Sequence, residues 1–410
     1  MVSFHTGCGA VTLPFEENFN SLSADAIPDC WNNDEGTSSD YYKWKAVTYS
    51  GHNTTTCVRF NSSTNAADAT NVLATPVIQL NEGNLLTFWT KNPTGGDFKV
   101  QIQAEGEARA DLLTGLTGIT DWTLKYVAIP ASYNNKKVQL FFCATSNDGD
   151  ANAYIFLDDV RIARGEIFED VVDAANTSRL NELVSAAETL DVITTRPMQF
   201  NGNYNTLCLP FNLTADQLAN ADCPLNNCEF KVFDYAEIDN GELVISITGA
   251  SSVVAGMPYF FRYLGTAGND HRAVLYKDVT ITAATAGNKT DVTYPVSYKG
   301  VFQTETLLAE DDGTDATHNN FFLGANNPIY WPLADYTANA FRAYFHIDPN
   351  EVTGLKKGMP LRLAESQQTT TTIDQIPGNN VQCVKVLENG YIVIIRNGVK
   401  YNVQGQVISK

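Results

Sequence analysis

The acidic residues that could bind a cation lie near the two ends of a β-rich region. Glu17 is in a short extended segment near the start, and Asp158 and Asp159 are in one of the last such segments. Successive residues of a strand point to opposite faces, so Asp158 and Asp159 cannot both face inward. Leu157 and Val160 flank the pair, which predicts that one carboxylate enters an apolar region, where an unpaired charge is costly.

Two kinds of partner could compensate such a carboxylate. A hard cation such as Ca²⁺ takes several oxygen ligands, often from separate segments, and the first and last strands of a jelly roll can lie side by side. The alternative is a salt bridge to Arg59 or Arg161. A second acidic segment, residues 147–150, has the density of a calcium loop but lacks the full EF-hand pattern, so we interpret it as a surface turn.

Aromatic residues gather in the first loops of the chain. Trp31, Tyr41, Tyr42 and Trp44 all occur before residue 45. Exposed, coplanar rings of this kind can stack on a sugar, because an aromatic ring offers an apolar face and tyrosine and tryptophan add a polar group. These four residues are therefore possible ligand-binding residues.

Catalysis has little support in the sequence. There is no G-x-S-x-G, H-E-x-x-H, P-loop or dinucleotide-binding motif, and the five histidines are isolated from one another. The paired carboxylates of a glycosidase must lie at particular separations in space, which a sequence does not reveal. We therefore expect a non-catalytic protein and keep a glycosidase or peptidase with a hidden site as the weaker alternative.

The charge balance argues against nucleic acid and anionic membranes as partners. The chain has 46 Asp and Glu against 27 Lys and Arg, a net charge of −19, whereas both partners attract basic surfaces. No apolar stretch is long enough to span a membrane. The first ten residues show no export signal, so we expect any signal to have been removed before this numbering begins. We expect a monomer.

Short β-rich segments separated by Gly, Asn and Pro predict a mainly β protein. Its 410 residues are too many for one core. We predict a jelly-roll β-sandwich at 1–164, a helical linker at 165–190, a second β-sandwich-like domain at 191–365, and a linker with a C-terminal β-meander at 366–410. Apolar residues at helical spacing, including Ile167 and Phe168, indicate the linker. Asn389-Gly390 and Asn397-Gly398 indicate hairpin turns in the meander.

The eight cysteines include no C-x-x-C pair, so a structural zinc site is not expected. Their even number is compatible with disulfides in an oxidising compartment, and equally with buried thiols. Cys223 and Cys228 enclose only four residues and could form a local bridge.

Several short motifs of the first region occur in a fixed order. They are Glu17-Asn18-Phe19-Asn20, Ile27-Pro28-Asp29-Cys30-Trp31, Lys43-Trp44 and the segments 71–78, 86–89, 122–130 and 156–162. In order and spacing they resemble the cleaved-adhesin domain of gingipain-type haemagglutinins, a jelly-roll module related to the MAM domains of cell-surface receptors.

This resemblance implies structural calcium. Its candidate ligands in this chain are Glu17, Asn20, Asp158 and Asp159, although the family often carries Glu where this chain has Asn20. The resemblance also implies that Trp31 and Trp44 are partly core residues, which competes with a role for them in sugar binding.

The remaining regions are similar to parts of bacterial surface proteins. The segments 206–211, 256–259 and 341–345 resemble a β-domain of surface proteins from gut and oral Gram-negative bacteria. Residues 381–410 resemble C-terminal segments of exported proteins, some of which serve in secretion or surface attachment. Together these similarities imply a secreted or outer-surface adhesion or recognition protein that binds a host surface protein or a glycan. The alternative is a carbohydrate-binding ancillary protein of a glycan-use system.

Overall fold

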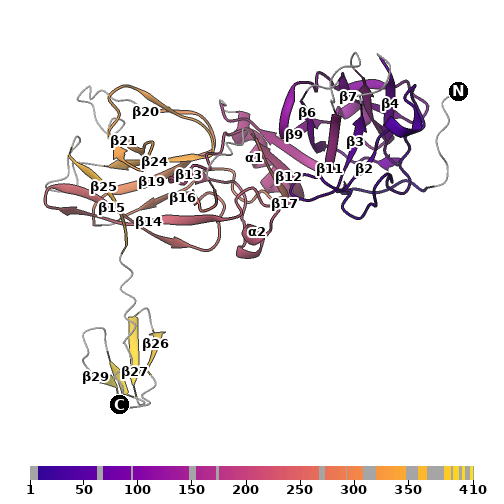
Figure 1. Cartoon of the computed structure of the whole chain (residues 1–410). Coiled ribbons are helices and arrows are strands. Elements are labelled where there is room, and N and C mark those ends of the chain that lie inside the picture. Colours follow the sequence, from indigo (N-terminus) through magenta and orange to yellow (C-terminus); the bar gives the residue numbers. More distant parts are fainter. Residues whose placement is uncertain are drawn as a thin grey trace. The chain divides into compact units, whose positions relative to one another are not determined.

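A computed structural model of the chain describes residues 8–61, 68–93, 96–146, 154–171, 175–266, 273–291, 293–307, 320–347, 359–366, 383–388, 391–396, 399–401 and 407–409. The chain divides into two compact units, Met1–Glu365 and Ser366–Lys410. As predicted, the protein is mainly β (Figure 1). The helical elements of the described residues are α1 (Ala175–Ala186), α2 (Ala215–Ala219) and the 3₁₀ turns Asp40–Tyr42 and Ala131–Tyr133. None of these helices is long and apolar enough to cross a membrane.

Residues 8–168 form a two-layer structure that we call the N-terminal sandwich. Sheet 1 contains β1 (Phe15–Glu17), β2 (Lys45–Val47), β3 (Cys57–Asn61), β6 (Asn84–Asn92), β9 (Ile119–Ala128) and β11 (Tyr154–Phe168), and continues into β12 (Thr189–Thr194) and β17 (Val274–Thr280). Sheet 2 contains β4 (Thr70–Ala74), β5 (Ile78–Gln79), β7 (Phe98–Ala104), β8 (Ala110–Leu113) and β10 (Lys137–Thr145). Alternate residues of facing strands, such as Phe60, Phe88 and Phe142, fill the core between the sheets. The predicted sandwich is confirmed.

The predicted helical linker at 165–190 is only partly correct. Strand β11 continues to Phe168, and residues 165–168 pair in parallel with residues 191–194 of β12. Helix α1 is thus the crossover between two parallel strands of one sheet (Figure 1). Gly165 permits this tight packing, because a Cβ there would lie 2.7 Å from the Cβ of Leu85. The helical spacing was misleading, since the short apolar run at Ile167 and Phe168 fits a buried strand equally well.

The rest of the larger unit forms a second sandwich. Sheet 3 contains β13 (Asn205–Cys208), β14 (Cys228–Asp239), β15 (Glu242–Ala250), β16 (Pro258–Tyr263) and β25 (Leu361–Glu365). Sheet 4 contains β18 (Asn288–Thr290), β19 (Val296–Val301), β21 (Asn320–Leu323), β22 (Ile329–Tyr330) and β24 (Arg342–Ile347), and β20 (Glu305–Leu307) pairs with β23 (Tyr336–Ala338). Stacked rings of Phe260, Tyr298 and Phe345 pack between the two sheets.

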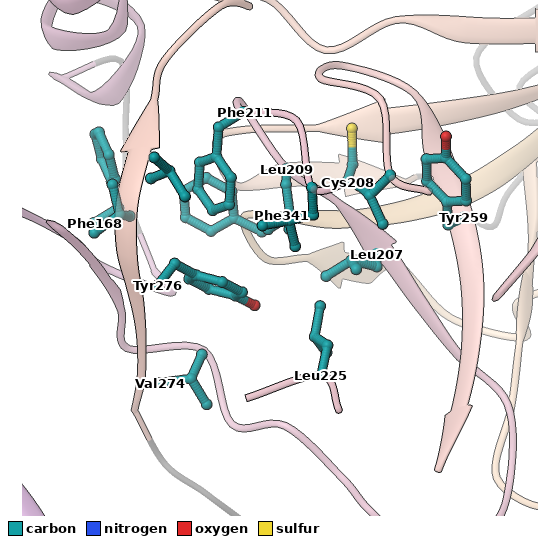
Figure 2. Packing of buried hydrophobic residues seen from close by; sticks show 14 of the residues in the cluster. Phe168, Leu207, Cys208, Leu209, Phe211, Leu225, Tyr259, Val274, Tyr276 and Phe341 are labelled. Carbon is teal, nitrogen blue, oxygen red and sulfur yellow. The ribbon is translucent and has the colours of Figure 1, made fainter. Parts of the chain in front are cut away.

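A separate apolar cluster ties sheet 1 to the second sandwich. Figure 2 shows Phe168 from the end of β11, Tyr276 from β17 and Leu207 from β13 in one buried group. Leu225 enters the same group from the loop before β14 and is fully buried. The junction between the two sandwiches is therefore a packed core rather than a loose connection.

The smaller unit is the predicted β-meander. Its strands β26 (Cys383–Glu388), β27 (Tyr391–Arg396), β28 (Val399–Tyr401) and β29 (Val407–Ser409) pair antiparallel in chain order. The two Asn-Gly turns lie outside the described residues.

The cysteines differ from the expectation of a local bridge. Cys8 and Cys30 form a disulfide, whereas Cys223 and Cys228 are free thiols. Both are partly buried, and burial raises the pKa of the Cys228 thiol to about 12.

Candidate functional site

Two of the four predicted ligand-binding aromatics belong to the core. Trp44 is 0% exposed and packs against Phe60 and Phe98. Trp31 is also buried and stacks on Phe142. Because a buried ring cannot stack on a ligand, the prediction of a sugar platform is wrong for Trp31 and Trp44, and the alternative that both are core residues holds.

The two tyrosines of this group lie at the surface. Tyr41 is 68% exposed and Tyr42 is partly exposed. Their rings are nearly perpendicular, at 85°, so they do not form a coplanar platform. The Lys45 ammonium lies over the Tyr41 ring, 4.6 Å from its centroid. Tyr41 thus stands beside β2, at the margin of sheet 1.

The face of sheet 1 that points away from the core carries a different set of aromatic residues. Strand alternation fixes this set. In β3, Val58 and Phe60 enter the core and Arg59 points away, and in β6, Phe88 enters the core and Lys91 points away. We call Tyr49, Arg59, Lys91, Trp122, Tyr154 and Phe156 the outer-face strip.

Cross-strand register places the centre of this strip in one row. Phe156 of β11 pairs with Arg59 of β3 on one side and with Lys91 of β6 on the other. The Arg59 guanidinium lies over the Tyr154 ring at 4.3 Å, and the Lys91 ammonium lies 4.5 Å from the Phe156 centroid and 5.3 Å from that of Trp122. The cations therefore lie against the rings as cation–π pairs.

Neither cation of the strip is neutralised by a carboxylate within the described part of the chain. Arg59 donates to the Tyr49 hydroxyl, and Lys91 donates to Ser50 Oγ at 2.9 Å. In a chain with a net charge of −19, two cations on one aromatic face without an acidic partner leave hydrogen-bond donors available to a ligand. Tyr49 is 66% exposed, so the strip is open to solvent at this end.

Sequence reasoning missed the strip, although a signal for it was present. The motif segments 86–89, 122–130 and 156–162 contain Trp89, Trp122 and Phe156, which alternate with residues that enter the core. Reading large aromatic residues on the face opposite the core would have pointed to this surface.

The predicted cation site centres on a fully buried carboxylate. Asp158 is 0% exposed and lies opposite Trp89 of β6. Its Oδ2 accepts the His52 backbone N–H at 2.8 Å, and its Oδ1 accepts the Asp159 backbone N–H at 2.9 Å. Burial, with the nearby charges of Asp159 and Glu17, raises the pKa of Asp158 to about 8.

The other predicted ligands differ in their surroundings. Asp159 lies within a bulge of β11 and adopts a positive φ of 46°, and its Oδ2 lies 2.8 Å from His52 Nδ1. Glu17 is half-buried, its Oε1 accepts the Phe19 backbone N–H, and burial raises its pKa. Asn20 is exposed, and its backbone N–H donates to Asn18 Oδ1.

The structure does not contain the alternative salt bridge, in which Asp158 would pair with Arg59 or Arg161. Arg161 binds Asp191, Asp278 and Glu16 instead, and Arg59 belongs to the outer-face strip. The partners of Asp158 among the described residues are therefore two backbone N–H groups, and burial favours its protonated form. Such a buried, incompletely compensated carboxylate fits a nearby cation.

The side chains alone do not complete a metal site. No three His, Cys, Asp or Glu side chains among the described residues form a cluster that could hold a metal ion. Ca²⁺ at Asp158 would need backbone carbonyls or water as further ligands, which calcium accepts readily. The acidic segment 147–150 lies outside the described residues.

Comparisons with known proteins cover the N-terminal sandwich. Neither a protein-family model nor a curated protein matches the chain. The K3 cleaved adhesin domain of Lys-gingipain from Porphyromonas gingivalis is 25% identical, with a TM-score of 0.30, and the match covers 36% of this chain and 97% of that domain. The N-terminal third thus matches the cleaved adhesin domain that the sequence motifs indicate.

Carbohydrate-binding modules also match part of the chain. TmCBM61 in complex with β-1,4-galactotriose is 18% identical, with a TM-score of 0.26, over 33% of this chain and 89% of that module. The CBM22-1 xylan-binding domain of Xyn10C from Paenibacillus barcinonensis is 12% identical, with a TM-score of 0.27, over 38% of this chain and 97% of that domain.

Proposed function

We propose that the N-terminal sandwich binds a saccharide at the outer-face strip, without catalysis, in a secreted or surface-exposed recognition protein. The observation that carries this proposal is the pair of partly exposed rings of Trp122 and Tyr154 beside the cations Arg59 and Lys91, with both rings packed against the buried Phe156. Rings offer apolar contact to the C–H faces of a sugar, and Arg59 and Lys91, which pair with no carboxylate among the described residues, would donate hydrogen bonds to its oxygens. The Cys8–Cys30 disulfide supports an oxidising compartment.

Two biological roles fit this chemistry. An adhesin would use the strip to hold a host glycan, and an ancillary protein of a glycan-use system would use it to hold a nutrient glycan. The strip itself favours a glycan over a host protein, because its ring and cation pattern matches a narrow polar ligand.

Removing the Trp122 ring is the sharpest test of this function. On a glycan array and then by titration calorimetry, we expect Trp122→Ala to weaken binding by roughly tenfold or more. Tyr235→Ala is the matched control, because Tyr235 is an exposed aromatic residue of β14 in the second sandwich. Wild-type protein that binds no glycan, or a Trp122→Ala variant that folds and keeps full affinity, would refute the proposal.

We also propose that Ca²⁺ binds at Asp158, with Glu17 or Asp159 contributing to the site. The support is the buried carboxyl group of Asp158, which burial and the nearby Asp159 and Glu17 keep protonated when no cation is bound. A bound Ca²⁺ would displace this proton, stabilise the ionised carboxylate and hold the end of β1 against β11.

A melting experiment tests the calcium proposal. Chelation is expected to lower the melting temperature by several degrees, since an ion at a hundred times its Kd stabilises the folded state by about 2.7 kcal/mol. Asp158→Asn should no longer respond, whereas Asp121→Asn, at an exposed residue of β9, should respond like wild type. Equal melting temperatures of the wild type with Ca²⁺ and with chelator would refute the calcium proposal.

A further inference from the structure

The outer face of sheet 1 is open at one end and covered at the other. Tyr49, at the open end, is 66% exposed, and Trp89 is partly exposed. Further along the same face, Thr87 of β6 is 2% exposed and its register partner Arg161 of β11 is 4% exposed. Arg161 is enclosed by its ion pairs with Asp191 of β12 and Asp278 of β17, and Thr87 lines a cavity opposite residues 221–224. A ligand lying on the strip is therefore blocked by a wall in this direction.

A cavity of about 460 Å³ lies where the open face meets this wall. His52, Thr87, Trp89 and Asp159 line it from the N-terminal sandwich. From the other side it is lined by residues 221–224, Asn226 and Asn227, by Val274, Leu275 and Lys277 of β17, and by Phe200 and Tyr263. Its volume is in the range of small-ligand sites, and its lining mixes aromatic rings with amides and charged groups.

The strip leads into this cavity through stacked rings. The His52 ring stacks on Trp89 with centroids 3.7 Å apart, and it meets Trp122 edge-on at 6.0 Å. Along β6, the outward residues Lys91, Trp89 and Thr87 span about 13 Å at the rise of a strand. A short oligosaccharide lying over Trp122 can therefore place its end in the cavity.

The far wall of the cavity is firmly anchored. Leu225, within the wall loop, is fully buried in the cluster of Figure 2, and Val274 belongs to the same cluster. Asn226 donates to the carbonyls of Leu218 and Ala219. The loop thus closes the face as a fixed stop.

The charges of the cavity favour an uncharged sugar. Asp159 and Asp222 are its carboxylates, and Lys277 is its one cation among the described lining residues. Lys277 already binds Glu16 and Asp222, and Asp159 already contacts His52. Because one lysine is shared by Asp222 and Glu16, carboxylates outnumber lysines here, and a terminal sugar with its own carboxylate or sulfate would be repelled.

From these observations we propose that the site recognises glycan chain ends, with the junction cavity taking a neutral terminal sugar and the outer-face strip taking the sugars that follow it. This inference rests on the proposed function, since it assumes that the strip binds a saccharide. It adds that an internal segment of a long chain cannot occupy the whole site.

This inference is tested by comparing the binding of long and short chains of the same polysaccharide at equal mass concentration. The probes are galactan, glucan, xylan and mannan, each intact and cut to fragments of a few units. For a polymer that binds, we expect apparent affinity per gram to rise roughly in proportion to the number of chain ends, because only ends fill the cavity. An affinity per gram that is unchanged by shortening would overturn chain-end recognition.

A cavity-filling variant gives an independent readout. Ala221→Trp places a large ring at the exposed rim of the cavity and should weaken fragment binding by roughly tenfold. Ala219→Trp, at an exposed position near Ala221 that does not line the cavity, should bind like wild type and melt at a similar temperature. If Trp122→Ala loses binding while Ala221→Trp keeps it, the strip binds a glycan but not by its end. If no wild-type binding occurs, both proposals fail.

Discussion

Replacing Arg161 by methionine is expected to lower the free energy of unfolding of the larger unit by about 3–5 kcal/mol. Arg161 is 4% exposed, and its Nε and Nη2 donate to the two carboxylate oxygens of Asp191 at 2.7 and 3.0 Å. Nη2 also donates to Asp278 and Nη1 to Glu16. The methionine would leave the buried Asp191 charge without its cation, and urea unfolding would measure the loss.

Two further variants distinguish the loss of the Arg161–Asp191 ion pair from a general loss of packing. The double variant Arg161→Met, Asp191→Leu should recover much of the stability, since it removes both buried charges together. Arg362→Met is the control, because Arg362 likewise pairs with more than one carboxylate, Asp239 and Glu242, but all three side chains are about half exposed. It should cost less than about 1 kcal/mol. An Arg161→Met cost as small as that of the control would contradict the burial argument.

The strands of this fold could be predicted where one face meets the core and the other meets solvent. Residues 98–102 alternate between apolar and polar side chains, and β7 forms there with Phe98, Val100 and Ile102 buried and Lys99 and Gln101 partly exposed. The end of β11 shows why the same reasoning failed elsewhere. Its last residues, 165–168, pair in parallel with β12, and so short an apolar run has no polar alternation to distinguish it from a helix.

The candidate site depends on contacts that the sequence does not record. Asp158 could be singled out, because its apolar neighbours indicate burial, but its partner His52 lies 106 positions away. Arg59, Phe156 and Lys91 come from three strands, and only their register puts them in one row. Conversely, Trp31 and Trp44 are close in sequence to Tyr41, yet both rings point into the core.

Asp158 is expected to make the calcium-free protein less stable as the pH rises from about 4 to about 8. Its folded-state pKa is raised from 3.8 to about 8, so the folded state holds a proton that the unfolded state releases. This stabilising contribution is complete below pH 3.8, falls by about 1.4 kcal/mol per pH unit through the window, and is gone above the folded-state pKa. Urea unfolding in chelator at a series of pH values would measure it.

The Asp158→Asn variant isolates this contribution from the other carboxylates. Asparagine cannot ionise, so the stability difference between wild type and variant should shift in favour of the variant as the pH rises, with the largest change between pH 4 and 8. Asparagine has one acceptor oxygen, whereas Asp158 accepts two backbone N–H groups through two oxygens. The lost hydrogen bond lowers the free energy of unfolding of the variant by the same amount at every pH, so it does not change the pH dependence. Asp121→Asn should leave the wild-type slope intact. A pH-independent difference would mean that Asp158 is ionised in the folded state, and its charge would then need a compensating partner even without calcium.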